Sequence, residues 1–371
     1  MNLFRSKEAI RCIRLLIVLT AVGSPLTFAN DTNGVTSVYT QRNLVSDGTV
    51  NAENTDPNLV NGWGVAFNPF GPLWVADNGT GVSTLYDGNG KVQPLVVTIP
   101  SPANVTDKGA PTGIVFNGSA GFVVTKDTTS GPARFIFATE DGVIAAWAPT
   151  VDATNAIRIV DNSASTKAVY KGLALSAGGS GSLLYATDFH NGKIDVFDSK
   201  FKPVTMESGA FTDPALPAGF GPFGIQAING DVYVSYAKQD QAKHDDVKGK
   251  GLGYVNVFDP NGKLIKRVAS QGELNAPWGM ALAPAGFGKF ANRLLIGNFG
   301  DGRINAFDLA SGEFIGTLTT ADQKPIEIEG LWGITFGNGF LTQSVNSLFF
   351  AAGPGDEQHG LVGRIDVTSE N

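Results

Sequence analysis

The sequence predicts an all-β fold, a six-bladed β-propeller whose last blade is closed by an N-terminal strand. A glycine-marked apolar strand recurs six times, at a mean spacing of about 54 residues between Trp63 and Trp332. An aromatic residue followed by Asp and a turn recurs at nearly the same spacing. Several short strands per repeat and many turns are typical of propeller blades.

Each repeat opens with a short apolar strand in which Gly is the second residue. In a propeller the first strand of every blade lines the central channel, and Gly lets that strand approach its neighbours closely. The predicted first strands are residues 63–67, 112–116, 171–175, 223–227, 278–282 and 332–336.

The second marker predicts the end of the third strand of a blade. Asp can accept hydrogen bonds from the backbone two residues further on, and Gly supplies a positive φ. We therefore interpret these Asp residues as turn formers rather than metal ligands, and expect the aromatic residue to face the next blade. The instances are Tyr86-Asp87, Phe197-Asp198, Phe258-Asp259 and Phe307-Asp308, with looser matches at Trp147 and Ile365-Asp366.

The sixth repeat begins at Trp332 and leaves room for only three strands before Asn371. Residues 35–40 alternate apolar and polar side chains, as a half-buried strand does. We expect this N-terminal strand to complete the last blade, which would leave no open sheet edge.

Residues 1–29 resemble a secretory signal, with a basic start, an apolar stretch over 15–22 and small residues before Asn30. This predicts a single propeller domain over 30–371 and a secreted, periplasmic or extracellular location. The only cysteine, Cys12, lies in the signal, so the mature chain would contain no disulfide.

The formal net charge is −7, and the signal holds four basic residues and one acidic residue, so the mature chain is more acidic still. An acidic domain is a poor binder of nucleic acid. No segment reaches membrane-spanning length. We expect a monomer whose partner is a protein, a glycan or a small molecule.

Polar loops are predicted to converge on one end of the ring, before each first strand and after each second strand. Functional residues are often carried by loops on a rigid scaffold. The predicted loops are 77–81, 126–131, 188–192, 238–251, 298–302 and 353–360. The loop-face binding candidates are Asp77, Asn78, Asp188, His190, His244, Asn298, Asp301 and His359.

Two segments, 73–78 and 188–194, resemble the strand-loop-strand signature of NHL-type six-bladed propellers, and the mature chain follows that rhythm. Segment 61–69, together with the loop at 77–81, is similar to a family of uncharacterised secreted bacterial propellers associated with the PEP-CTERM sorting system. The resemblance implies export but no particular molecular function.

The blade rhythm also resembles that of regucalcin-like and gluconolactonase-like propellers, which hold a divalent cation with carboxylate and amide oxygens. One such ligand directly precedes the first-strand glycine. In this sequence that position holds Trp63, Thr112, Lys171, Phe223, Trp278 and Trp332. None supplies a carboxylate or amide oxygen, as a hard cation requires. We therefore predict no metal and no cofactor, and leave open a divalent cation near Asn61 or Glu329.

The residues before the glycines instead predict an aromatic channel mouth, with channel-mouth binding candidates Trp63, Lys171, Phe223, Trp278 and Trp332. These rings could pack together and close the channel. They could also form a shallow site on which a sugar or an apolar group stacks.

All three histidines, His190, His244 and His359, fall in the predicted loops beside acidic residues. Histidine with carboxylates can bind a transition metal, although loops of different blades are well separated. No nucleophile elbow, Walker loop or zinc-protease motif is found, so no catalytic residue is assigned. The sequence favours a binding or scaffold module, with a metal-dependent hydrolase or lactonase as the alternative.

Overall fold

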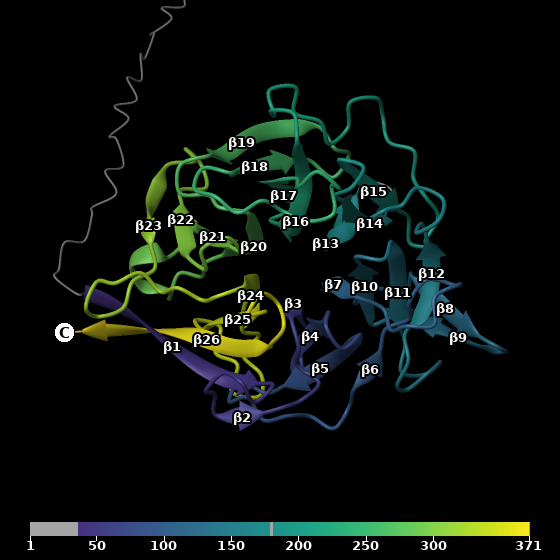
Figure 1. Cartoon of the computed structure of the whole chain (residues 1–371), viewed down its shortest axis with the longest axis horizontal. Coiled ribbons are helices and arrows are strands. Elements are labelled where there is room, and N and C mark those ends of the chain that lie inside the picture. The colour runs from purple at the N-terminus through teal and green to yellow at the C-terminus, as the bar shows by residue number, and fades with distance from the viewer. Residues whose placement is uncertain (1–35, 179–180, 371) are drawn as a thin grey trace, which may run out of the picture. The chain divides into compact units, whose positions relative to one another are not determined.

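The computed structural model describes residues 36–178 and 181–370. Six β-sheets stand around a central axis, as the predicted propeller requires (Figure 1). The predicted signal, residues 1–29, lies outside the described residues. Within the described part of the chain, no helix has the length and apolar character needed to cross a lipid bilayer.

The first three blades follow one another along the chain, each with its first strand at the channel. Blade 1 contains β3 (Gly62–Phe67), β4 (Leu73–Asp77), β5 (Val82–Tyr86) and β6 (Val97–Thr98). Blade 2 contains β7 (Pro111–Phe116), β10 (Phe135–Thr139), β11 (Val143–Trp147) and β12 (Ile157–Asp161). Blade 3 contains β13 (Tyr170–Gly178), β14 (Gly181–Asp188) and β15 (Lys193–Phe197).

The last three blades continue the same order. Blade 4 contains β16 (Phe220–Ile228), β17 (Asp231–Lys238), β18 (Gly253–Phe258) and β19 (Leu264–Ser270). Blade 5 contains β20 (Pro277–Leu282), η1 (Gly288–Phe290), β21 (Leu294–Asn298), β22 (Ile304–Phe307) and β23 (Phe314–Thr317). Blade 6 contains β24 (Leu331–Phe336), β25 (Leu348–Ala352), β26 (Leu361–Glu370), β1 (Thr36–Ser46) and β2 (Asn54–Thr55).

The predicted closure of the last blade is confirmed. Strand β1 pairs antiparallel with β26, from Thr36 opposite Glu370 to Ser46 opposite Leu361, with a register shift between Asn43 and Val45. The first and last described strands therefore lie side by side (Figure 1).

The core is divided among the blade interfaces. Between blades 2 and 3, for example, Ile136 and Ile144 pack against Leu184 and Phe197, and all four are buried. The aromatic residue that ends each third strand therefore packs on the preceding blade, as Phe197 does, and not on the next one as we expected. Tyr86 of blade 1 packs in the same way against blade 6 and completes the ring.

The first-strand glycines are points of close approach between blades. A Cβ atom built on Gly333 would lie 2.5 Å from the carbonyl oxygen of Trp63, and one built on Gly279 would lie 2.5 Å from that of Trp332. Each of the six glycines meets the first strand of the following blade in this way: Gly64, Gly113, Gly172, Gly224, Gly279 and Gly333. Glycine is thus required here by space rather than by backbone conformation.

The Asp residues after the third strands form turns, as predicted. Asp259 Oδ1 accepts hydrogen bonds from the backbone N–H groups of Asn261 and Lys263, both at 2.9 Å. Asp87, Asp198 and Asp308 accept equivalent pairs of backbone hydrogen bonds.

Blade 2 departs from the prediction. Residues 126–131, expected as a loop at the channel end, belong to an inserted hairpin of β8 (Val123–Lys126) and β9 (Thr129–Pro132). Lys126 pairs with Asp152, beyond the far end of β11. The second strand is β10, and the loop after it begins at Glu140. The run at 123–125 satisfies a strand pattern, yet Val123 is exposed because the hairpin leaves the blade.

Candidate functional site

The aromatic side chains before the first-strand glycines pack against one another and close the channel. Trp63 and Trp332 stack with ring centroids 3.4 Å apart, and Phe299 stacks on Trp332 at 3.9 Å. Trp278 meets both indoles edge-on. The predicted channel-mouth candidates Trp63, Lys171, Phe223, Trp278 and Trp332 are all 8% exposed or less. They are brought together, but as a buried plug and not as an open stacking surface.

Hydrogen bonds fix two of the plug indoles. Trp278 Nε1 donates to the carbonyl oxygen of Lys171 at 3.1 Å, and Trp332 Nε1 donates to Asn61 Oδ1 at 3.1 Å. Trp63 Nε1 is buried without a hydrogen-bond partner in the described residues. The plug is therefore both apolar and oriented, which favours a single packing arrangement.

A cavity of about 380 Å³ lies on the side of the plug away from the converging loops. It is lined by the later residues of the first strands, including Val65, Phe67, Ile114 and Phe336. Gln226 adds a polar group to this wall. The plug thus separates this cavity from the loops at the other end.

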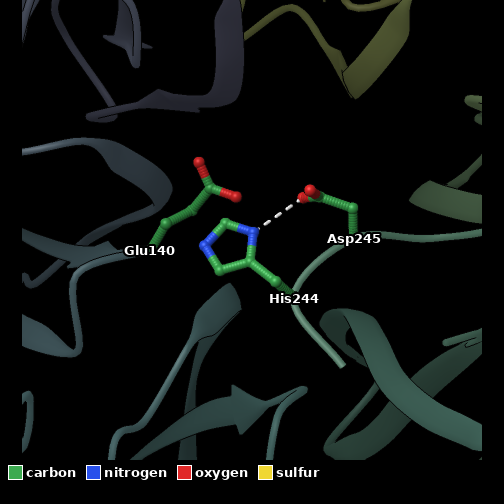
Figure 2. Close-up of side chains that lie close together, drawn as sticks. All are labelled: Glu140, His244 and Asp245. Carbon is green, nitrogen blue, oxygen red and sulfur yellow. Dashed lines mark hydrogen bonds and ion pairs between the residues drawn. The ribbon is translucent and has the colours of Figure 1, made fainter. Parts of the chain in front are cut away.

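We call the end of the ring that carries the loops after the second strands the loop face. At its centre lies the Lys171 cluster, which consists of Lys171, Glu140, His244 and Asp245. The Lys171 ammonium forms an ion pair with Glu140 and a second with Asp245 Oδ1 at 3.2 Å. His244 Nδ1 is 2.9 Å from Asp245 Oδ1 (Figure 2). One potential ligand atom from each of Glu140, His244 and Asp245 lies within 4.8 Å of the other two.

The cluster joins three blades. Lys171 is the second residue of β13, the channel strand of blade 3, and Glu140 follows β10 of blade 2. His244 and Asp245 lie in the long loop between β17 and β18 of blade 4. Figure 2 shows Glu140 on one side of the His244 imidazole and the loop that carries His244 and Asp245 on the other side. Glu140 is also held by Asn78 of blade 1, whose Nδ2 donates to Glu140 Oε2 at 2.9 Å.

The charges in the cluster stabilise one another. Burial alone would lower the pKa of Lys171, but Glu140 and Asp245 outweigh it and raise that pKa above its ordinary value. The hydrogen bond from His244 lowers the pKa of Asp245, and the same bond raises the pKa of His244. Lys171 therefore stays an ammonium near neutral pH and cannot act as a nucleophilic amine.

Two further carboxyl groups at the loop face are less well compensated by nearby cations and hydrogen-bond donors. Burial raises the pKa of Asp246 to about 7, although Lys171 and Lys248 oppose this effect. Burial also raises the pKa of Glu357, against a hydrogen bond of 2.7 Å from Asn61 Nδ2. The two carboxyl groups repel each other, and Asp246 Oδ2 has no hydrogen-bond partner in the described residues.

Several predicted loop-face residues instead support the turns. Asp77 Oδ2 accepts from the Thr84 backbone N–H at 2.9 Å, and burial raises the pKa of Asp77. Asp188 accepts hydrogen bonds from Asn191 in the turn that follows it. Asn298 and Asp301 bond to each other at 3.1 Å. Of the predicted loop-face residues, only His244 belongs to the Lys171 cluster, and Asn78 supports the cluster through its hydrogen bond to Glu140.

The three histidines do not come together. His244 lies in the Lys171 cluster, whereas His359 Nδ1 is 2.8 Å from Asp47 Oδ2, in the segment after β1. His190 is half-buried at the blade 3 loop and belongs to neither group. A metal site shared by all three histidines is therefore not formed.

Sequence reasoning missed Glu140, because the hairpin in blade 2 shifted the predicted loop. The signal was present in the run Thr139-Glu140-Asp141-Gly142, which ends a strand as Asp77 to Gly79 does in blade 1. In the sequence, Asp245, Asp246 and Glu357 stand out only as acidic neighbours of histidines, and nothing there assigns them to a common site.

Comparisons with known proteins place the chain among relatives. No family model matches it. Uncharacterized protein R648 of Acanthamoeba polyphaga mimivirus is 34% identical over 328 residues, which cover 87% of this chain and 78% of that protein. Uncharacterized protein L690 of the same virus is 31% identical over 329 residues, covering 87% and 84%.

Solved structures share the fold at low sequence identity. A Bacteroides thetaiotaomicron protein of unknown function has a TM-score of 0.55 and 13% identity, with 90% of this chain and 76% of that chain covered. A glucose dehydrogenase has a TM-score of 0.53 and 12% identity, covering 88% and 99%. A streptogramin B lyase has a TM-score of 0.50 and 12% identity, covering 90% and 98%. These similarities show a propeller fold and nothing about activity.

Proposed function

We propose a binding function for this chain, which belongs to the same family as the mimivirus proteins R648 and L690. Its loop face recognises a positively charged group, an ammonium or a guanidinium, of the kind carried by proteins, amino sugars and small amines. The plug is buried, so the ligand contacts the polar groups above it and not the indole rings.

The observation that carries this proposal is the unequal charge at the centre of the loop face. Four carboxyl groups gather there: Glu140, Asp245, Asp246 and Glu357. Lys171 is buried and already paired with two of them, Glu140 and Asp245. Asp246 and Glu357 have raised pKa values because their burial outweighs the effect of the nearby lysines. A ligand cation would add positive charge and restore their ionised form.

The test is the binding of a fluorescent oligolysine peptide, followed by anisotropy. Asp246→Asn and Glu357→Gln should each weaken binding about tenfold, because each removes a partly buried negative charge. Asp127→Asn, on the exposed hairpin of blade 2, is the matched control and should bind as the wild type does. Equal weakening by all three variants would mean that peptide binding depends only on the net charge of the protein, and it would contradict the proposal.

A second candidate function is a metal-dependent hydrolase or lactonase. Two observations favour it, the close approach of Glu140, His244 and Asp245 and the near-neutral pKa of Asp246, which suits a general acid or base. Hydrolysis of an aryl ester or a sugar lactone that a chelator abolishes would support this candidate over binding alone.

We also propose that the protein is exported, on the strength of the signal-like residues 1–29 and the resemblance to the PEP-CTERM-associated secreted family. The mature protein then begins at Asn30. N-terminal sequencing of protein recovered outside the cytoplasm tests this, and a sequence that starts at Met1 would contradict it.

A further inference from the structure

Lys171 is the one charged residue among the six that precede the first-strand glycines. Its side chain is 2% exposed, and its ammonium lies 5.1 Å from the ring centroid of Trp63 in the plug. A buried ammonium is costly unless it is paired and hydrogen-bonded. The surroundings of this one residue must therefore supply negative charge.

The surroundings do so from both sides. Glu140 reaches Lys171 from blade 2 and Asp245 reaches it from blade 4, so two loops meet over a lysine of the blade between them. His244 adds an imidazole within 4.8 Å of both carboxylates. Asn78 orients Glu140 through a hydrogen bond to its second oxygen, as the supporting residues of metal sites orient their ligands.

The imidazole and the carboxylates of this cluster can also bind a metal ion. Imidazole and carboxylate groups both bind Zn²⁺, and an open zinc site takes three protein groups and a water. The same carboxylates that pair with Lys171 belong to this set. Because the His244 and Asp245 side chains are 49% and 65% exposed, they can change rotamer without displacing packed neighbours.

We propose that the Lys171 ammonium occupies a cation site formed by Glu140, His244 and Asp245, and that these three residues bind a divalent transition metal once that ammonium is removed. In the natural protein the chain thus supplies its own cation, which holds the loops of blades 2 and 4 together over the plug. This inference goes beyond the proposed binding function, because the chain itself supplies the cation and Asp246 and Glu357 are not involved. It stands against the second candidate function, which would need Glu140, His244 and Asp245 free for a metal ion in the natural protein.

The experiment compares Zn²⁺ binding to the wild type and to Lys171→Met by titration calorimetry, with Co²⁺ absorption as the spectroscopic check. Methionine keeps an unbranched apolar stem over Trp63 and removes the charge. We expect the variant to bind one Zn²⁺ at least about tenfold more tightly than the wild type, a difference of about 1.4 kcal/mol. Adding His244→Ala should cancel that gain.

Two controls keep the charge or remove a different one. Lys171→Arg retains a cation at the site and should show no gain. Lys250→Met removes an exposed cation from the same loop of blade 4, where Lys250 pairs with Glu273, and should also show no gain. A gain in Lys250→Met equal to that of Lys171→Met would overturn the proposal, because it would reflect the net charge alone.

The proposal also fails if folded Lys171→Met binds Zn²⁺ no more tightly than the wild type does. If Lys171→Met does not fold without metal, Zn²⁺ should restore its thermal transition, and it should not restore that of the double variant with His244→Ala. Absence of this rescue would likewise overturn the proposal. Loss of oligolysine binding in Asp246→Asn bears only on the proposed function, so the two tests can fail separately.

Discussion

The indole rings of Trp63 and Trp332 stack face to face with their centroids 3.4 Å apart, although the two residues belong to the first and the last blade of the ring. Gly333, the residue after Trp332, abuts the carbonyl oxygen of Trp63. Closure of the ring is therefore achieved at the channel as well as at the outer strand β1.

Trp332→Ala should destabilise the protein by about 4 kcal/mol, because it removes a fully buried indole and leaves a cavity in the plug. Chemical denaturation measures the change. Phe70→Ala is the control, since Phe70 is 81% exposed, and it should change stability by less than about 0.5 kcal/mol. A Trp332→Ala protein as stable as the wild type would show that the plug does not contribute to folding.

Gly333→Ala should cost about 2 kcal/mol, because the new methyl group would lie 2.5 Å from the Trp63 carbonyl oxygen and push two blades apart. The free energy of unfolding in urea is the appropriate measure. Gly118→Ala serves for comparison, because Gly118 is exposed and a Cβ atom built on it would meet only the edge of the Phe116 ring, at 3.3 Å. Similar losses for both variants would mean that the close approach at Gly333 is unimportant.

Deletion of residues 30–46 should lower the melting temperature sharply, because it removes β1 and exposes the edge of β26. Differential scanning calorimetry of the chain with and without these residues would detect this. A chain that begins at Thr36 keeps β1 and serves as the reference. An unchanged melting temperature after the longer deletion would refute the role of β1 in closure.

Asp246→Asn should change how stability depends on pH. Because burial raises the pKa of Asp246 to about 7, the folded protein keeps a proton that the unfolded chain releases above about pH 4. Stability of the wild type therefore falls as the pH rises from about 4 to about 7, and the Asn variant lacks this contribution. Across that range, the urea midpoint of the variant should rise relative to that of the wild type as the pH rises.

The same measurement on Asp127→Asn gives the baseline, because Asp127 is exposed on the blade 2 hairpin. Its difference from the wild type should stay constant with pH. A constant difference for Asp246→Asn as well would show that this carboxyl group is not buried in the folded protein.

Much of the fold could be predicted because its determinants are local and repeated. The glycine at 64 and its five counterparts mark strands that meet at the channel, and Asp259 forms its turn with residues two and four positions away. The closing strand was predictable from the alternation at 35–40 and from the three strands left for the last blade.

The candidate site was less predictable because its contacts join distant parts of the chain. Glu140 and Asp245 meet only through Lys171, and nothing in their local sequences indicates that the loops of blades 2 and 4 meet over blade 3. The inserted hairpin at 123–132 displaced the expected loop further. Burial of Trp278 and Trp332 likewise depends on how closely the six strands approach the axis.

The pairing of β1 with β26 also has a consequence for the order in which the protein is made. Residues 36–46 leave the ribosome long before their partners, residues 361–370. Blade 6 therefore cannot be completed until residues 361–370 have been made. Until then β1 has no partner in β26, and the ring stays open at its last blade.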